Sequence, residues 1–152
     1  MSNKPYYIFL IDDDEDDRDL FKDALREISI KTEVVSFNNG LELMAQLEDE
    51  NNGLPQIIFL DLHMPIIGGE DCLKKIRKNA QFNGIPVVIY STYYIQQMAN
   101  RLMGLGANLY IQKPSSFSLL KSILERCIIA LLENKVAQEE DTNFVLKENE
   151  WE

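Results

Sequence analysis

Short apolar runs alternate along the chain with stretches of helical periodicity. The runs are four to six residues long and rich in Ile, Val, Phe and Tyr, which favours strands. We predict strands over residues 6–11, 33–37, 56–60, 86–90 and 109–112. Between them, apolar positions recur every three or four residues, most clearly at Leu20, Phe21, Ala24, Leu25 and Ile28, which predicts amphipathic helices. These helices are expected over residues 15–28, 41–48, 69–78, 94–103 and 117–136.

The strict alternation of strand and helix predicts an α/β fold. Strands that are apolar throughout are buried on both faces, as in a parallel sheet joined by right-handed crossovers. Five such units suggest a flavodoxin-like, doubly wound five-stranded parallel sheet of order 2-1-3-4-5 with helices on both faces. In that order the first and third strands are neighbours, and ligands bind in the crevice beyond their carboxyl ends.

Polar side chains stand at the carboxyl ends of four predicted strands. In chain order they are Asp12 and Asp13, Asp61, Ser91 followed by Thr92, and Lys113. Taken alone, Asp61 fits at least as well as a turn residue, the ordinary role of Asp before a loop. Because carboxyl ends of parallel strands meet at one edge, the four strand ends together favour a chemical site instead.

Three carboxylates at one edge predict a cation site and a nucleophile. They repel one another unless a cation is present, and Mg²⁺ (or Mn²⁺) prefers such hard oxygen ligands. An ionised Asp61 could then attack a phosphoryl group and form an aspartyl phosphate. The Lys113 ammonium would neutralise phosphoryl oxygens, and Ser91 would hydrogen-bond one of them. The backbone carbonyl of His63 could complete the metal shell, whereas its side chain fits better as a surface or packing group.

The acidic run at residues 12–19 is also compatible with a calcium loop or with the start of a helix. A calcium loop is rejected, because Asp17 stands where its sharp turn needs Gly and Asp23 where it needs Glu. Acidic residues at the start of a helix, favourable against its dipole, account for residues 14–17. Only the first two carboxylates of the run are therefore assigned to the site.

Charge and composition restrict the partners. The 152 residues are 45% hydrophobic, carry a formal net charge of −10 and have a pI near 4.6. Such a surface repels phosphates over about 8 Å at physiological salt, which argues against nucleic-acid or anionic-membrane binding. No apolar run approaches the ~18 residues that span a bilayer. Cys72 and Cys127 are far apart and suggest no disulfide framework. We expect a cytoplasmic protein.

Domain organisation is expected to be simple. Residues 1–137 would form one domain, and residues 138–152 an acidic C-terminal tail, by composition partly disordered, with no output domain.

Several motifs occur together in the order of a known family. The sequence resembles the receiver domain of bacterial two-component response regulators over roughly residues 5–136. The matching features are Asp12 and Asp13, Asp61 within Phe-Leu-Asp-Leu-His-Met-Pro, Ser91, Tyr110, and Gly106-Ala107 leading to Lys113-Pro114. The Asp-Asp-Asp-Glu-Asp-Asp-Arg start and long fifth helix are also similar to single-domain regulators that pair with phytochrome-type histidine kinases.

The resemblance implies a signalling role. Asp61 would accept a phosphoryl group from a phosphohistidine on a sensor histidine kinase or phosphotransfer protein, with the metal held by Asp12, Asp13, Asp61 and the His63 carbonyl. Ser91 and Lys113 would be drawn toward the phosphate. Tyr110 would rotate inward and remodel the surface of the fourth helix, fifth strand and fifth helix for an unknown downstream protein.

The resemblance also implies details of chemistry and assembly. The Lys113-Pro114 bond is expected to be cis, and Thr92 to narrow access to the phosphate. The bulky His63 and Tyr93 would slow attack by water and lengthen the life of the phosphoryl state. Apolar residues of the fifth helix exceed what one face needs, so a homodimer surface and packing on the sheet both stay open.

Two other classes of function compete. A Mg²⁺-dependent hydrolase with an aspartyl-phosphate intermediate would use the same carboxylates, hydroxyl and lysine. It would need an acid-base carboxylate two residues after the nucleophile, where this chain has His63. A purely structural interaction module would show no Mg²⁺-dependent change at all.

Overall fold

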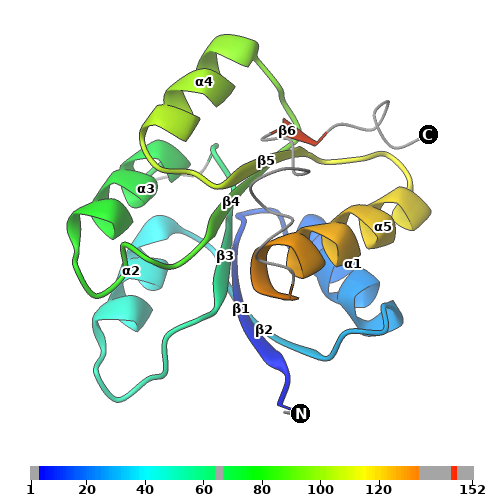
Figure 1. Cartoon of the computed structure of the whole chain (residues 1–152), viewed down its shortest axis with the longest axis horizontal. Coiled ribbons are helices and arrows are strands. Elements are labelled where there is room, and N and C mark those ends of the chain that lie inside the picture. The colour runs from blue at the N-terminus through cyan, green and yellow to red at the C-terminus, as the bar shows by residue number, and fades with distance from the viewer. Residues whose placement is uncertain (1–3, 64–66, 134–144, 147–152) are drawn as a thin grey trace.

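The computed structural model describes residues 4–63, 67–133 and 145–146 as an α/β sandwich of three layers (Figure 1). The strands are β1 (Tyr6–Ile11), β2 (Thr32–Phe37), β3 (Ile57–Leu60), β4 (Val87–Ser91), β5 (Leu109–Gln112) and β6 (Val145–Leu146). The helices are α1 (Glu15–Glu27), α2 (Gly40–Glu48), α3 (Gly69–Lys78), α4 (Gln96–Gly104) and α5 (Phe117–Ile128). The chain continues from α5 into a π-helical turn over Ile129–Glu133.

The sheet has the predicted order. Within the described residues, parallel strands are arranged β2-β1-β3-β4-β5-β6, so the order 2-1-3-4-5 is confirmed. The short strand β6 lies within the segment expected to be a tail and extends the sheet by pairing with β5, Tyr110 opposite Val145. Two residues of that segment are therefore strand, and the rest of it lies outside the described residues.

Two apolar cores lie on opposite faces of the sheet. Alternate residues of each strand point to opposite faces, so Phe9 and Ile11 of β1 enter one core and Ile8 and Leu10 the other. Helices α2, α3 and α4 cover the first core, and α1 and α5 the second (Figure 1). The position of β1 between β2 and β3 makes its carboxyl end the topological switch point of the sheet.

Side-chain caps fix where the helices start. Asp14 accepts a hydrogen bond from the backbone N–H of Asp17 at 3.1 Å and begins α1 directly after β1. Asn39 caps α2 in the same way through the N–H of Glu42 at 3.0 Å. The Glu42 carboxylate accepts from the N–H of Asn38 at 2.9 Å, a reciprocal cap.

The fifth helix packs mainly on the sheet. Ile123, Leu124, Cys127 and Ile128 of α5 are buried in the second core, as is Leu131 of the π-helical turn that follows. Most of the apolar residues of α5 thus serve the core of this chain, and Ile129 is partly exposed at 38%. Among the described residues, no helix is long and apolar enough to cross a bilayer.

Candidate functional site

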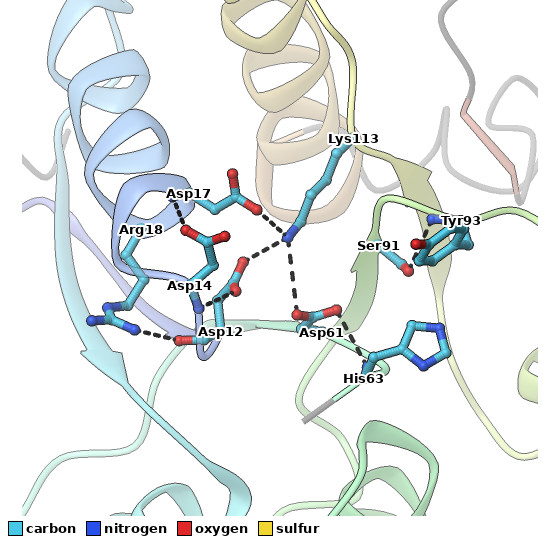
Figure 2. A network of polar contacts seen from close by, with 9 residues as sticks. All are labelled: Asp12, Asp14, Asp17, Arg18, Asp61, His63, Ser91, Tyr93 and Lys113. Atoms are coloured by element: carbon cyan, nitrogen blue, oxygen red, sulfur yellow. Dashed lines mark hydrogen bonds and ion pairs between the residues drawn. The ribbon is translucent and has the colours of Figure 1, made fainter. Parts of the chain in front are cut away.

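The sheet brings the predicted site residues to one edge. Asp12 follows β1, Asp61 follows β3, Ser91 ends β4 and Lys113 follows β5 (Figure 2). Backbone pairing continues past two strand ends, since Asp61 N–H donates to the Ile11 carbonyl at 3.0 Å and Asp12 N–H to the Phe37 carbonyl at 3.1 Å. The carboxylates are therefore held by the sheet rather than by a free loop.

Three carboxylates converge there. Ligand oxygens of Asp12, Asp13 and Asp61 lie within 4.8 Å of one another. Asp12 is fully buried and Asp61 is 7% exposed, whereas Asp13 faces solvent. The cavity beside them has a volume of about 140 Å³. A group of hard oxygens at this spacing, open to solvent on one side, fits a divalent cation that keeps some of its water.

Lys113 lies above the carboxylates and is the cation that faces them. Its Nζ is 2.7 Å from Asp12 Oδ2, 2.8 Å from Asp17 Oδ2 and 3.9 Å from Asp61 Oδ2 (Figure 2). The ammonium also stands 5.0 Å from the centre of the Tyr90 ring, a cation–π distance. Burial alone would lower the pKa of Lys113, but hydrogen bonds to Asp12 and Asp17 and the charge of Asp61 raise it instead.

Asp61 has the most perturbed acidity in this cluster. The pKa of Asp61 is raised from 3.8 to about 7, and burial is the largest cause. The charge of Lys113 and the His63 N–H lower this pKa, whereas the charges of Asp12 and Asp13 raise it further. The His63 N–H donates to Asp61 Oδ1 at 3.4 Å. A second positive charge in the cavity would favour the ionised, nucleophilic form of Asp61.

The residues after β4 form one wall of the cavity. Ser91 is fully buried, and its Oγ accepts a hydrogen bond from the Tyr93 N–H at 3.3 Å. Thr92 is exposed and lines the cavity, and Tyr93 is 64% exposed. The Tyr93 ring meets the His63 ring edge-on, with ring centres 5.5 Å apart. These two bulky side chains therefore lie together at the mouth of the cavity.

Tyr110 is buried inside the sheet. Only 1% of it is exposed, and its hydroxyl donates to the backbone carbonyl of Tyr93. The inward ring position expected for the phosphorylated protein is thus already adopted in this structure. The Lys113-Pro114 bond is trans, so the expectation of a cis bond is wrong. The trans form is the lower in free energy for most X-Pro bonds, by about 0.5–1 kcal/mol.

Two residues of the site are not assigned to it by the sequence pattern. The helix dipole alone accounts for Asp17 in the sequence, yet its carboxylate binds Lys113. Arg18 donates from Nη1 to the Asp12 carbonyl at 2.7 Å and ties α1 to the end of β1 (Figure 2). The signal for Asp17 is its spacing, because it lies one helical turn after the capping residue Asp14 and so returns over the strand end.

Gly69, the first residue of α3, sits against the backbone of Asp61. Its N–H donates to the Leu62 carbonyl at 3.1 Å. A Cβ at this position would stand 2.3 Å from the Asp61 carbonyl oxygen and 2.9 Å from the Leu62 Cα. Only glycine allows this approach, so the start of α3 is packed directly on the residue that carries the candidate nucleophile.

A doubly wound sheet with a carboxylate cluster, a buried hydroxyl and a partly buried lysine at its switch-point edge is the arrangement of a receiver domain of phosphoryl-transfer signalling. The family comparison gives the same class: the model for the response regulator receiver domain matches residues 8–125, and the chain belongs to this family.

The most similar proteins include cyanobacterial regulators. The chain is 32% identical over 116 residues to response regulator Rcp1 of Synechocystis sp., covering 74% of this chain and 79% of Rcp1. The crystal structure of the phosphorylated cyanobacterial phytochrome response regulator RcpA matches with a TM-score of 0.78 at 31% identity, covering 86% of this chain and 96% of RcpA. The Mn²⁺-bound form of Rcp1 matches with a TM-score of 0.75 at 29% identity, covering 85% of this chain and 96% of that one.

Proposed function

We propose that Asp61 accepts a phosphoryl group from a phosphohistidine of a sensor histidine kinase or phosphotransfer protein. A carboxylate oxygen of Asp61 attacks phosphorus, the P–N bond breaks, and the imidazole leaves with the electron pair and takes up a proton. The observation that carries the proposal is a buried Asp61, 7% exposed, placed between two carboxylates and the Lys113 ammonium.

The residues present fit a divalent metal. Asp12, Asp13, Asp61 and the backbone carbonyl of His63 would hold Mg²⁺, with Mn²⁺ as a substitute, which the Mn²⁺-bound structure of the relative Rcp1 supports. When bound, the metal neutralises charge on the phosphoryl oxygens. Asp12 and Asp61 are fixed by the sheet, so they would meet the cation with little rearrangement.

The remaining side chains have separate roles. Lys113 and Ser91 would neutralise and hydrogen-bond the transferred phosphoryl oxygens, with Thr92 beside them at the cavity. His63 and Tyr93 would limit the access of water, because their rings meet at its mouth. Tyr110 would couple the site to the surface of α4, β5 and α5 through its hydrogen bond to the Tyr93 carbonyl.

The protein we propose is a phosphoacceptor that catalyses its own phosphorylation and its slow dephosphorylation. A hydrolase that turns over a separate substrate is disfavoured by His63, which stands where an acid-base carboxylate is needed. The location would be the cytoplasm, where ATP charges the partner histidine.

Phosphorylation would act through a surface. The face of α4, β5 and α5 would change. Two apolar side chains of this part of the chain are exposed: Ile95, the N-cap of α4, at 61%, and Met103, within α4, at 50%. The occupant of this face would be a downstream protein or a second copy of this chain. Sedimentation of the phosphorylated and unphosphorylated forms would distinguish a homodimer from a hetero-complex.

The test is intact mass after incubation with Mg²⁺ and acetyl phosphate. Wild type should gain one phosphoryl group that is stable in acid and labile in base, and Asp61→Asn should gain none. A chelator should prevent the gain in wild type. Labelling of Asp61→Asn to the same extent, or rapid multiple turnover of acetyl phosphate by wild type, would overturn the proposal.

A further inference from the structure

A carboxylate outside the metal cluster binds Lys113. The Lys113 Nζ is 2.8 Å from Asp17 Oδ2 and 2.7 Å from Asp12 Oδ2, but 3.9 Å from Asp61 Oδ2 (Figure 2). Asp17 lies in the first turn of α1, and its N–H donates to Asp14 Oδ1 at 3.1 Å. The cap that begins α1 therefore also fixes Asp17 against the lysine.

The two short bonds limit what Lys113 can offer to Asp61. An ammonium group has three donors, and Asp12 and Asp17 each occupy one. A phosphoryl group on Asp61 would add negatively charged oxygens on the side where the lysine now makes its longest contact. The third donor is free for one of these oxygens, and Lys113 can give them a second hydrogen bond only if one of its present bonds breaks.

Burial decides which bond breaks. The Asp12 side chain is 0% exposed, so water cannot take the place of the lysine at Asp12 Oδ2, and a bond lost there is not replaced. The Asp17 side chain is 33% exposed, so water can replace the lysine there. The bond between Lys113 and Asp17 is therefore the one that is released.

We propose that Asp17 is a positioning residue that holds Lys113 back from Asp61 before phosphorylation and releases it when a phosphoryl group arrives. The inference rests on the proposed function of Asp61. Asp17 favours the unphosphorylated state, because its bond to Lys113 exists in that state and is given up in the other. Removing the carboxylate should tighten binding of a phosphoryl group or its mimic.

Four proteins make the comparison: wild type, Asp17→Asn, Asp16→Asn and Asp17→Glu. Asp16 is exposed on the same turn of α1, so its variant removes the same charge without removing the bond to Lys113. The first measurement uses metal-free protein and follows acetylation of Lys113 by a water-soluble ester, read by peptide mass. Lys113 should react faster in Asp17→Asn than in Asp16→Asn. Equal rates would show that Asp17 does not hold Lys113 and would overturn the inference.

The second measurement titrates beryllium fluoride, a phosphoryl mimic, at saturating Mg²⁺ and follows the backbone amide of Ser91 by NMR. The half-saturating concentration should be about threefold lower for Asp17→Asn than for Asp16→Asn, as expected for a partly exposed ion pair. Asp17→Glu should behave like wild type. An equal or higher value for Asp17→Asn would overturn the inference alone, whereas no binding by wild type would overturn the proposed function with it.

Discussion

We predict that ionised Asp61 destabilises the metal-free protein at pH 8. Its pKa rises from 3.8 to about 7, mainly through burial. A native state that binds the proton more tightly gains stability at low pH. That gain is complete below pH 3.8 and is lost as the pH rises through about 7. Above pH 7, the raised pKa of Asp61 therefore lowers the free energy of unfolding by about 4 kcal/mol, compared with a carboxylate whose pKa is unshifted.

Asp61→Asn removes this cost, because asparagine has nearly the same shape and no charge. The Lys113 Nζ lies 3.9 Å from Asp61 Oδ2 in wild type. In the variant it would face an amide N–H group in place of a carboxylate, which offsets part of the gain in stability. We therefore expect the free energy of unfolding at pH 8 to rise by about 2 to 4 kcal/mol. The increase should shrink steadily toward pH 5, where wild-type Asp61 binds a proton.

Urea unfolding in the presence of a chelator measures this at several pH values, provided the denaturant slopes agree between variants. Asp13→Asn is the matched control, since Asp13 belongs to the same cluster but is exposed. Its effect should stay below about 1 kcal/mol. The reasoning is refuted if Asp61→Asn gives no gain at pH 8, or if the gain at pH 5 is as large.

Three further predictions concern the metal, the phosphate and the scaffold. Mg²⁺ at a hundred times its Kd for wild type should stabilise wild type by about 2.7 kcal/mol. Thermal unfolding with and without chelator checks this, and an equal gain in Asp13→Asn at the same Mg²⁺ concentration would contradict the proposed ligands. Replacing both His63 and Tyr93 by Ala should shorten the life of the phosphoryl state, measured by intact mass over time, and equal lifetimes would show that these rings do not restrict water. Arg77 donates to the Gly106 carbonyl at 2.9 Å and to two other carbonyls. Arg77→Lys should lower the free energy of unfolding by about 1 to 2 kcal/mol in urea, and an unchanged midpoint would contradict that.

The strands and most of the candidate site could be predicted because each depends on local sequence. A strand buried on both faces must be apolar throughout, so its end is marked by the first polar residue, as at Asp12 and Asp61. Neighbouring carboxyl ends then follow from the sheet order alone. The helix predicted over residues 117–136 shows the limit: its α-helical part ends at Ile128 and a π-helical turn follows.

Features that depend on a distant partner could not be predicted. The strand Val145–Leu146 is too short for a periodic signal and exists because the edge of β5 offers unpaired backbone groups. The role of Asp17 depends on Lys113, 96 residues away in sequence. In the sequence, the favourable interaction of Asp17 with the helix dipole is enough to explain a carboxylate at this position. The pattern therefore gives no sign that Asp17 also binds Lys113. The hydrogen bond from the Tyr110 hydroxyl to the Tyr93 carbonyl likewise depends on the loop that follows another strand.

The contact between Gly69 and Asp61 gives the site an uneven stiffness. On the α3 side, the backbone of Gly69 packs directly on the backbone of Asp61. No side chain lies between them that could change its rotamer to make room. On the β4 side, Asp61 faces Ser91 and the exposed Tyr93 across the cavity. We therefore expect bulk added to the Asp61 side chain to be accommodated toward the cavity and β4 rather than toward α3. Under the proposed function, a glycine packed on the backbone of Asp61 would thus restrict the directions in which the site can respond to phosphorylation.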